Sequence, residues 1–156
     1  MLPARERLTR SSLFSRAYTT RKSVGNQLLT VYVLPRTSAK SRNRGKESAN
    51  PKEFALNRSS LHPVDKMPLV RMPLAGFVIA KKVCKSACRR NRAKRRVREA
   101  YRLLRNEDQA LFTRLEQWYA IVFVMHEKVL AASWNEVRDA VRDGLKRIND
   151  KYGLVR

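Results

Sequence analysis

The sequence has few acidic residues, few cysteines and no long hydrophobic run, and each scarcity excludes a class of protein. Of its 156 residues, 13 are Asp or Glu and 35 are Lys or Arg, so the formal net charge is +22. The longest uninterrupted apolar run, residues 119–125, is far shorter than the ~20 residues of a membrane-spanning helix. The first residues lack the apolar segment of a secretory signal. We therefore expect neither a membrane protein nor a secreted one.

Metal-site and enzyme motifs are also lacking. Cys84 and Cys88 form neither a CxxC pair nor a disulfide framework, and neither His62 nor His126 stands at ligand spacing from them. We expect two reduced thiols, as in a cytoplasmic protein. The sequence contains no phosphate-binding loop, no G-x-G-x-x-G and no H-E-x-x-H. No paired-carboxylate site can be recognised either, so any catalysis in which the protein takes part is expected to reside elsewhere.

The positive charge is concentrated in two blocks. Residues 1–46 carry 11 basic residues and one acidic residue (net +10), and residues 81–105 carry 12 and one (net +11). Residues 47–80 add +1, and residues 106–156 are neutral, so two blocks hold +21 of the +22. Such a charge repels itself unless a polyanion is present. RNA or DNA is therefore the expected partner, ahead of an anionic membrane.

Periodic patterns predict an α+β fold. The pattern indicates helices over 9–18, 86–105 and 134–151, strands over 28–34, 74–80 and 119–125, and a turn or short strand over 22–26. Residues 106–117 either prolong the basic helix or form a separate turn. The order αβββαβα is typical of a small two-layer sandwich with a four-stranded sheet. We expect one domain over 1–156, interrupted by a flexible, aperiodic insertion over 36–72.

Local signals add detail to these elements. Thr9 or Ser11 is the candidate N-cap of the first helix, and Ser133 with Glu136 fits a capping box before the last. Alternation places three aliphatic side chains on one face of the second strand: Leu29, Val31 and Val33. Thr30 and Tyr32 then share the other face. In the strand over 74–80 the small residues Gly76, Val78 and Ala80 share a face on which a strand of RNA could approach the sheet.

The helix over 86–105 is amphipathic, with a cationic outer side. Its apolar stripe is formed by Ala93, Val97, Ala100, Tyr101 and Leu104. Its opposite face carries Asn91, Lys94, Arg95, Arg98, Arg102 and Arg105. Cations three and four residues apart repel one another, so the pattern favours a phosphate-binding face over a solvated helix without a partner.

These residues resemble a known family. Arg90-Asn91-Arg92, followed by Lys94-Arg95 and 98–102, is similar to the RNR helix of the bacterial ribonuclease P protein subunit. Three other segments also fit this family: residues 79–83 before the helix, the strand residues 31–34, and Arg7-Leu8 with Phe14 and Tyr18. The resemblance implies a left-handed βαβ crossover around the basic helix. It also places the N-terminal helix in the mature fold, against the transit peptide that an Arg-, Ser- and Thr-rich start would otherwise indicate.

The resemblance implies a ribonucleoprotein that removes the 5′ leader from precursor tRNA. A catalytic RNA subunit would perform the hydrolysis with Mg²⁺ that it mainly holds itself, and one protein would bind each RNA in the cytoplasm. The residues expected to bind the RNA subunit are Arg90, Asn91, Arg92, Lys94, Arg95, Arg98 and Arg102. The residues expected to bind the single-stranded leader, in a cleft between the first helix and the sheet, are Phe14, Tyr18, Tyr32, Lys81 and Lys82. Aromatic platforms among cations suit single strands, although Phe14 also fits the core.

Three features depart from the family pattern. The insertion over 36–72 is atypical, the stretch between Lys82 and Arg90 is about one residue longer than usual, and Val78 and Ala80 are apolar where small polar residues are common. Two other readings stay open from the residues alone. One is a structural RNA-binding protein such as a ribosomal protein. The other is a basic leucine zipper, which the missing heptads disfavour.

Overall fold

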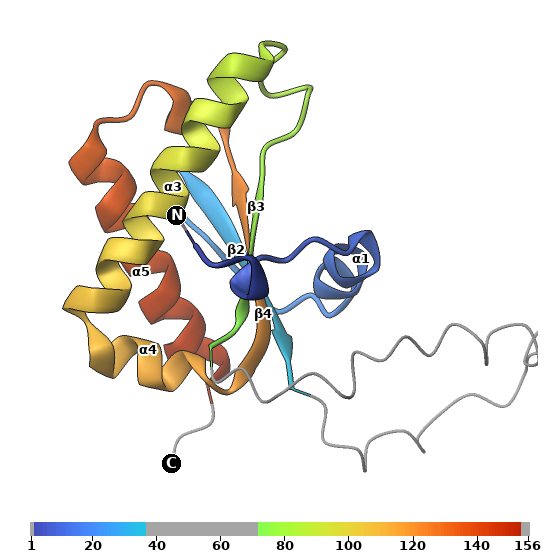
Figure 1. The fold of residues 1–156 in the computed structure, drawn as a ribbon, viewed down its shortest axis with the longest axis vertical. Coiled ribbons are helices and arrows are strands. Elements are labelled where there is room, and N and C mark those ends of the chain that lie inside the picture. Colours follow the sequence, from blue (N-terminus) through green and yellow to red (C-terminus); the bar gives the residue numbers. More distant parts are fainter. Residues whose placement is uncertain (1, 37–71, 154–156) are drawn as a thin grey trace, which may run out of the picture. The chain divides into compact units, whose positions relative to one another are not determined.

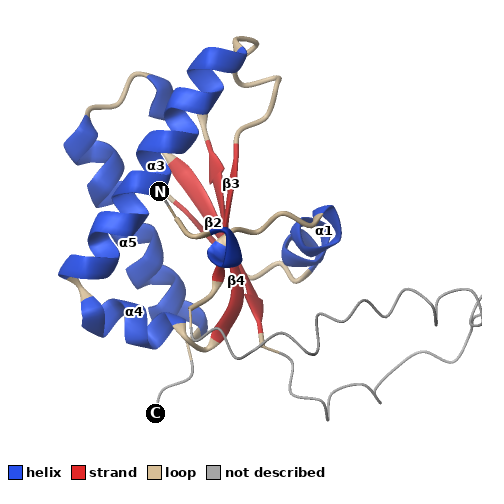
Figure 2. Cartoon of the chain, in the orientation of Figure 1, coloured by secondary structure: helices blue, strands red, loops and turns tan. Residues whose placement is uncertain are grey.

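The computed structural model describes residues 2–36 and 72–153. The first range holds the 3₁₀ helix η1 (Ala4–Glu6), α1 (Ser11–Thr19), β1 (Ser23–Gly25) and β2 (Leu29–Pro35). The second holds β3 (Leu74–Val78), α3 (Ala87–Glu107), α4 (Gln109–Leu115), β4 (Trp118–Met125), the 3₁₀ helix η5 (Glu127–Leu130) and α5 (Trp134–Tyr152) (Figure 2). This mixed α+β architecture confirms the predicted class. The flexibility expected for the insertion concerns residues that lie almost entirely outside the described ranges.

The four strands form one sheet in the order β1-β2-β4-β3. β2 pairs antiparallel with β1 and with β4, whereas β3 and β4 run parallel. A parallel pair needs a crossover, and α3 with α4 supplies it. Its left-handed sense stays a prediction from the resemblance. Beside β3, the Leu8 N–H donates to the Ala75 carbonyl at 3.0 Å, so the N-terminal segment extends the sheet at this edge.

Helices lie on both faces of the sheet. Figure 1 shows α3 and α5 on one side and α1 on the other. The predicted alternation along β2 is confirmed, because Leu29, Val31 and Val33 are fully buried in the core shared with α3 and α5. Tyr32 lies on the opposite face, against α1. The two periods, 2 in the strands and 3.6 in the helices, therefore determine this core.

The predicted apolar stripes of the long helices are confirmed. All five stripe residues of α3 are at most 3 % exposed. The stripe of α5 is fully buried and comprises Val137, Val141, Leu145 and Ile148. The capping box also forms: the Ser133 hydroxyl accepts from the Glu136 N–H, and the Glu136 carboxylate accepts from the Ser133 N–H at 2.6 Å.

Some predicted boundaries are wrong for local reasons. α1 begins after Arg10, which provides no side-chain cap, so neither Thr9 nor Ser11 caps the helix. α3 continues to Glu107, and α4 then starts because the Asp108 carboxylate accepts the Leu111 N–H at 3.1 Å. β3 ends two residues early because the chain turns at residues 81–83.

A partly buried ion pair corrects the prediction for Arg105, which the helical pattern placed on the cationic outer face. Its guanidinium instead bonds the Glu6 carboxylate at 2.5 Å, and Glu6 is only 4 % exposed. The pair attaches η1 to the last turns of α3. Because the partners lie 99 residues apart along the chain, no local pattern predicts this contact.

Candidate nucleic-acid interface

Four predicted RNA-binding residues on α3 have no partner within the described part of the chain. Asn91, Arg92 and Arg95 are exposed, and Lys94 is half-buried. They follow the Ser86 cap at one end of the helix, where the apolar stripe holds the opposite face against the sheet. Arg guanidinium groups can make paired hydrogen bonds to phosphate. These side chains are therefore available to a polyanion.

Arg90 is held by the loop that precedes its own helix. Its Nη1 donates to the Cys84 carbonyl at 2.8 Å and to the Lys85 carbonyl at 2.7 Å. These bonds join the start of α3 to the turn after β3. Arg90 thus shapes the loop that carries neighbouring cations, besides any contact with RNA. Sequence reasoning assigned it only the second role, because the curl of the loop is a tertiary feature.

Arg98 and Arg102 also have partners within the protein. The Arg98 guanidinium lies over the Phe77 ring, 5.5 Å from its centroid, and burial followed by repulsion from Arg7 and Arg95 lowers its pKa. Arg102 binds both oxygens of Glu99, and the hydrogen bond from Arg102 lowers the pKa of that carboxyl. Of the seven predicted residues, the structure thus leaves four without partners and ties three to the protein.

The predicted aromatic residues come together on the opposite face of the sheet. Tyr18 and Tyr32 meet edge to face, with ring centroids 5.0 Å apart and an interplanar angle of 85°. Tyr18 is 39 % exposed, and partial burial followed by the neighbouring Tyr32 raises its pKa. Phe14 is half-buried and packs against the same apolar cluster. We call Phe14, Tyr18 and Tyr32 the aromatic patch.

Gly76 serves the aromatic patch in a way that sequence reasoning misjudged. A Cβ at this position would lie 2.7 Å from the Phe14 Cε1 atom and 3.0 Å from the Leu8 Cδ2 atom. The space above Gly76 is therefore filled by the protein and is not open to RNA. Lys81 and Lys82, the cations predicted beside the leader, are exposed in the turn after β3.

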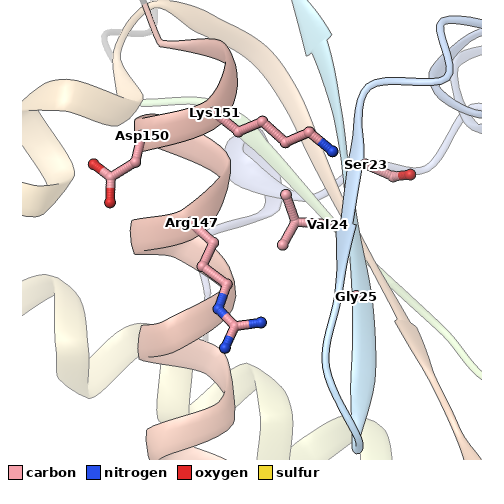
Figure 3. A pocket seen from close by; sticks show the side chains of 6 residues that line it. All are labelled: Ser23, Val24, Gly25, Arg147, Asp150 and Lys151. Carbon is pink, nitrogen blue, oxygen red and sulfur yellow. The ribbon is translucent and has the colours of Figure 1, made fainter.

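A shallow pocket lies apart from all of these predicted residues. It has a volume of about 540 Å³ and is lined by Ser23, Val24, Gly25, Arg147, Asp150 and Lys151. Figure 3 shows Arg147 and Lys151 reaching from α5 toward β1, while Asp150 points away. Asp150 pairs with Arg114 at 3.0 Å, and Arg147 pairs with Asp143 at 2.9 Å. The cationic lining is thus partly neutralised by neighbouring groups.

Comparison with known proteins decides the family. A family model described as Ribonuclease P matches residues 2–149. The chain belongs to the ribonuclease P protein family. A "Ribonuclease P protein component" from Alkaliphilus oremlandii is 30% identical over 148 residues, 95% of each chain. Another from Caldanaerobacter subterraneus is 27% identical over 146 residues, covering 92% of this chain and 91% of the relative. The resemblance seen in the RNR helix is therefore confirmed.

Solved ribonuclease P proteins share the fold. The Staphylococcus aureus protein superposes with a TM-score of 0.57 at 18% identity, covering 91% of this chain and 94% of that chain. The Thermotoga maritima protein gives 0.54 at 21% identity, covering 91% and 96%. Family membership implies an RNA partner and a place in tRNA processing. It also sets aside the ribosomal-protein and leucine-zipper readings.

Two basic residues of α3 were missed from the sequence. Arg96 donates to the Ala132 carbonyl at 2.6 Å and so joins α3 to the loop before α5. Arg89 is exposed on the first turns of α3 beside the predicted cations. Its place in the same basic run was the signal that could have identified Arg89 from the sequence.

None of the helices in the described ranges is long and apolar enough to cross a bilayer.

Proposed function

We propose that this protein is the subunit of ribonuclease P that binds both the catalytic RNA and the 5′ leader of precursor tRNA. The observation that carries the proposal is the placement of two unlike surfaces on one small sheet. Cations without a partner among the described residues lie on α3, whereas the aromatic patch lies on the opposite face of the sheet, where α1 supplies two rings and β2 supplies Tyr32. One protein of this design can contact a folded RNA and a single strand at the same time.

The α3 surface supports binding of the RNA subunit. Asn91, Arg92, Lys94 and Arg95 occupy about one and a half turns, so their side chains reach phosphates over a short stretch of backbone. Each neutralised phosphate releases counterions, which makes such binding strongly dependent on salt. Arg90 keeps the preceding loop in place, and Arg98 and Arg102 add charge at the periphery.

The aromatic patch supports binding of the leader. A base that stacks on an exposed aromatic ring gains about 1–3 kcal/mol, largely without regard to sequence. Tyr18 offers the more exposed ring, and the Tyr32 ring packs against it from β2 of the sheet. Lys81 and Lys82 follow β3 and would attract the leader phosphates. The pocket between β1 and α5 lies elsewhere. The proposal of a leader cleft therefore rests on these side chains and on the family resemblance.

Catalysis would belong to the RNA, with Mg²⁺ held mainly by that subunit. Among residues 2–36 and 72–153, no group of three or more His, Cys, Asp or Glu side chains could hold a metal ion. The α3 surface is also cationic, which opposes metal binding there. The protein would position the substrate and screen phosphate repulsion, with one copy for each RNA.

The test is a cleavage assay with a bacterial ribonuclease P RNA and a precursor tRNA at low Mg²⁺. We expect the protein to stimulate release of the 5′ leader, and Arg92→Ala with Arg95→Ala to reduce the stimulation. The matched control replaces two exposed lysines that belong to neither surface, Lys128→Ala with Lys146→Ala, and should retain it. If the wild-type protein gives no stimulation, the proposed function is wrong.

A further inference from the structure

A strip of small residues continues from the aromatic patch toward one end of the sheet. The strand register aligns Thr30 with Val124 on β4 and Val124 with Val78 on β3. These three side chains share the α1-side face with Tyr32, because Tyr32 is two residues from Thr30. All three are half-buried, whereas Leu34 and Ala120, further along the same face, are buried in the cluster beneath α1. The strip is therefore less covered than the part of the face beneath α1.

A histidine and a threonine form a hydrogen-bonded pair on this strip. The His126 Nε2 and Thr30 Oγ1 atoms are 3.0 Å apart, and both residues are half-buried. His126 follows β4 and continues its ladder, because its N–H donates to the Leu28 carbonyl at 2.9 Å. Its side chain therefore returns to the same face as Val124. Within the described residues, Thr30 and His126 make no other side-chain hydrogen bond.

The pair keeps one donor and one acceptor for a ligand, whichever partner donates. If the threonine hydroxyl donates to Nε2, the imidazole retains an N–H at Nδ1 and the hydroxyl oxygen retains a lone pair. If Nε2 donates, the hydroxyl proton and the Nδ1 lone pair remain available. Every RNA base has both donors and acceptors on its edges. The neighbouring Val124 and Val78 offer only apolar contact.

The distance between Thr30 and Tyr32 along β2 suits two adjacent nucleotides of an extended single strand of RNA. Thr30 and Tyr32 are two residues apart on β2, which is about 7 Å along the strand. A base stacked against the tyrosine pair thus places the adjacent nucleotide over Thr30 and His126. We propose that the Thr30–His126 pair hydrogen-bonds the base of the leader nucleotide adjacent to the one on the aromatic patch, and so discriminates among leader sequences. This inference rests on the proposed function.

The experiment compares precursor tRNAs that carry each of the four bases at each leader position in turn. Binding to the assembled ribonucleoprotein is measured against mature tRNA, which lacks the leader. For the wild-type protein we expect one position where the best and worst bases differ about three- to tenfold, as for a neutral hydrogen bond. Thr30→Val and His126→Phe should reduce this ratio to below about twofold. Both variants should keep most of the general preference for precursor over mature tRNA.

Matched variants separate this inference from the proposed function and from a structural role. Thr30→Ser retains the hydroxyl and should retain the discrimination, whereas Tyr32→Ala should weaken all leaders alike. If wild type shows no discrimination, or if Thr30→Val and His126→Phe preserve it, the inference is wrong. If only a 2′-deoxy substitution abolishes binding at that position, the contact is to the sugar and the assignment to the base is wrong. Equal wild-type affinity for precursor and mature tRNA would instead refute the leader-binding function.

Discussion

The salt dependence of RNA binding provides a quantitative test of the α3 surface. Arg92 and Arg95 are exposed and have no partner in the part of the chain that the structure describes, so each can neutralise one phosphate. One such contact changes the slope of log affinity against log salt by about 0.7 for single strands and 0.9 for a duplex. Arg92→Ala with Arg95→Ala should therefore reduce the magnitude of the slope by about 1.4–1.8.

The same slope determines the loss of affinity at each salt concentration. At about 0.1 M salt, two lost contacts correspond to roughly 25- to 60-fold weaker binding, and at about 0.4 M to only about fourfold to fivefold. Fluorescence anisotropy with labelled ribonuclease P RNA over this range measures both quantities. The variant and wild-type curves should converge as the salt concentration rises.

The control is a variant with the same net charge and an unchanged α3 surface. Lys128→Ala with Lys146→Ala also removes two positive charges, from η5 and α5. It should leave the slope near that of wild type, because these lysines are not part of the proposed contact. An unchanged slope in the Arg92 and Arg95 variant, or an equal reduction in the control, would refute the assignment of the RNA interface to α3.

Three further predictions test the leader surface and the packing behind it. Tyr32→Ala should weaken binding of precursor tRNA by about 1–3 kcal/mol without affecting mature tRNA; an equal loss for both would contradict a leader contact. Gly76→Ala should lower the free energy of unfolding in urea by about 1–3 kcal/mol, because its Cβ would lie 2.7 Å from Phe14; an unchanged midpoint would show that Phe14 moves freely. Burial raises the pKa of Tyr101, so the folded state keeps this proton after the unfolded state starts to lose it near pH 10. Stability should therefore fall as the pH rises above about 10, and Tyr101→Phe should flatten that fall; the same slope in both proteins would contradict it.

The local patterns of the sequence predicted most elements and the side chains that they bury. Period-2 alternation placed Leu29 and Tyr32 on opposite faces of β2, and helical periodicity identified the buried stripes of α3 and α5. The turn signals were less reliable, because a cap such as Thr9 depends on where the chain enters the helix. These successes share one cause: hydrophobic periodicity is a local property that folding converts directly into burial.

The roles of the individual cations depended on the tertiary structure. The sequence identified a basic helix, and the family resemblance added RNA binding. Neither the sequence nor the resemblance distinguished two groups of cations. Arg92 and Arg95 have no partner in the described chain, whereas each of three others does: Arg90, Arg98 and Arg102. The guanidinium groups are alike in sequence, and only their surroundings distinguish them.

The sequence by itself determined the polyanion partner, the α+β class and the two faces of the sheet. Charge composition and periodicity carry this information without any long-range contact. Only the tertiary structure decided that Arg105 neutralises the buried Glu6, that Phe14 fills the space above Gly76, and that His126 meets Thr30. The partners in these contacts lie 62 to 99 residues apart along the chain. Their meeting follows from the order and register of the strands, which no local pattern specifies.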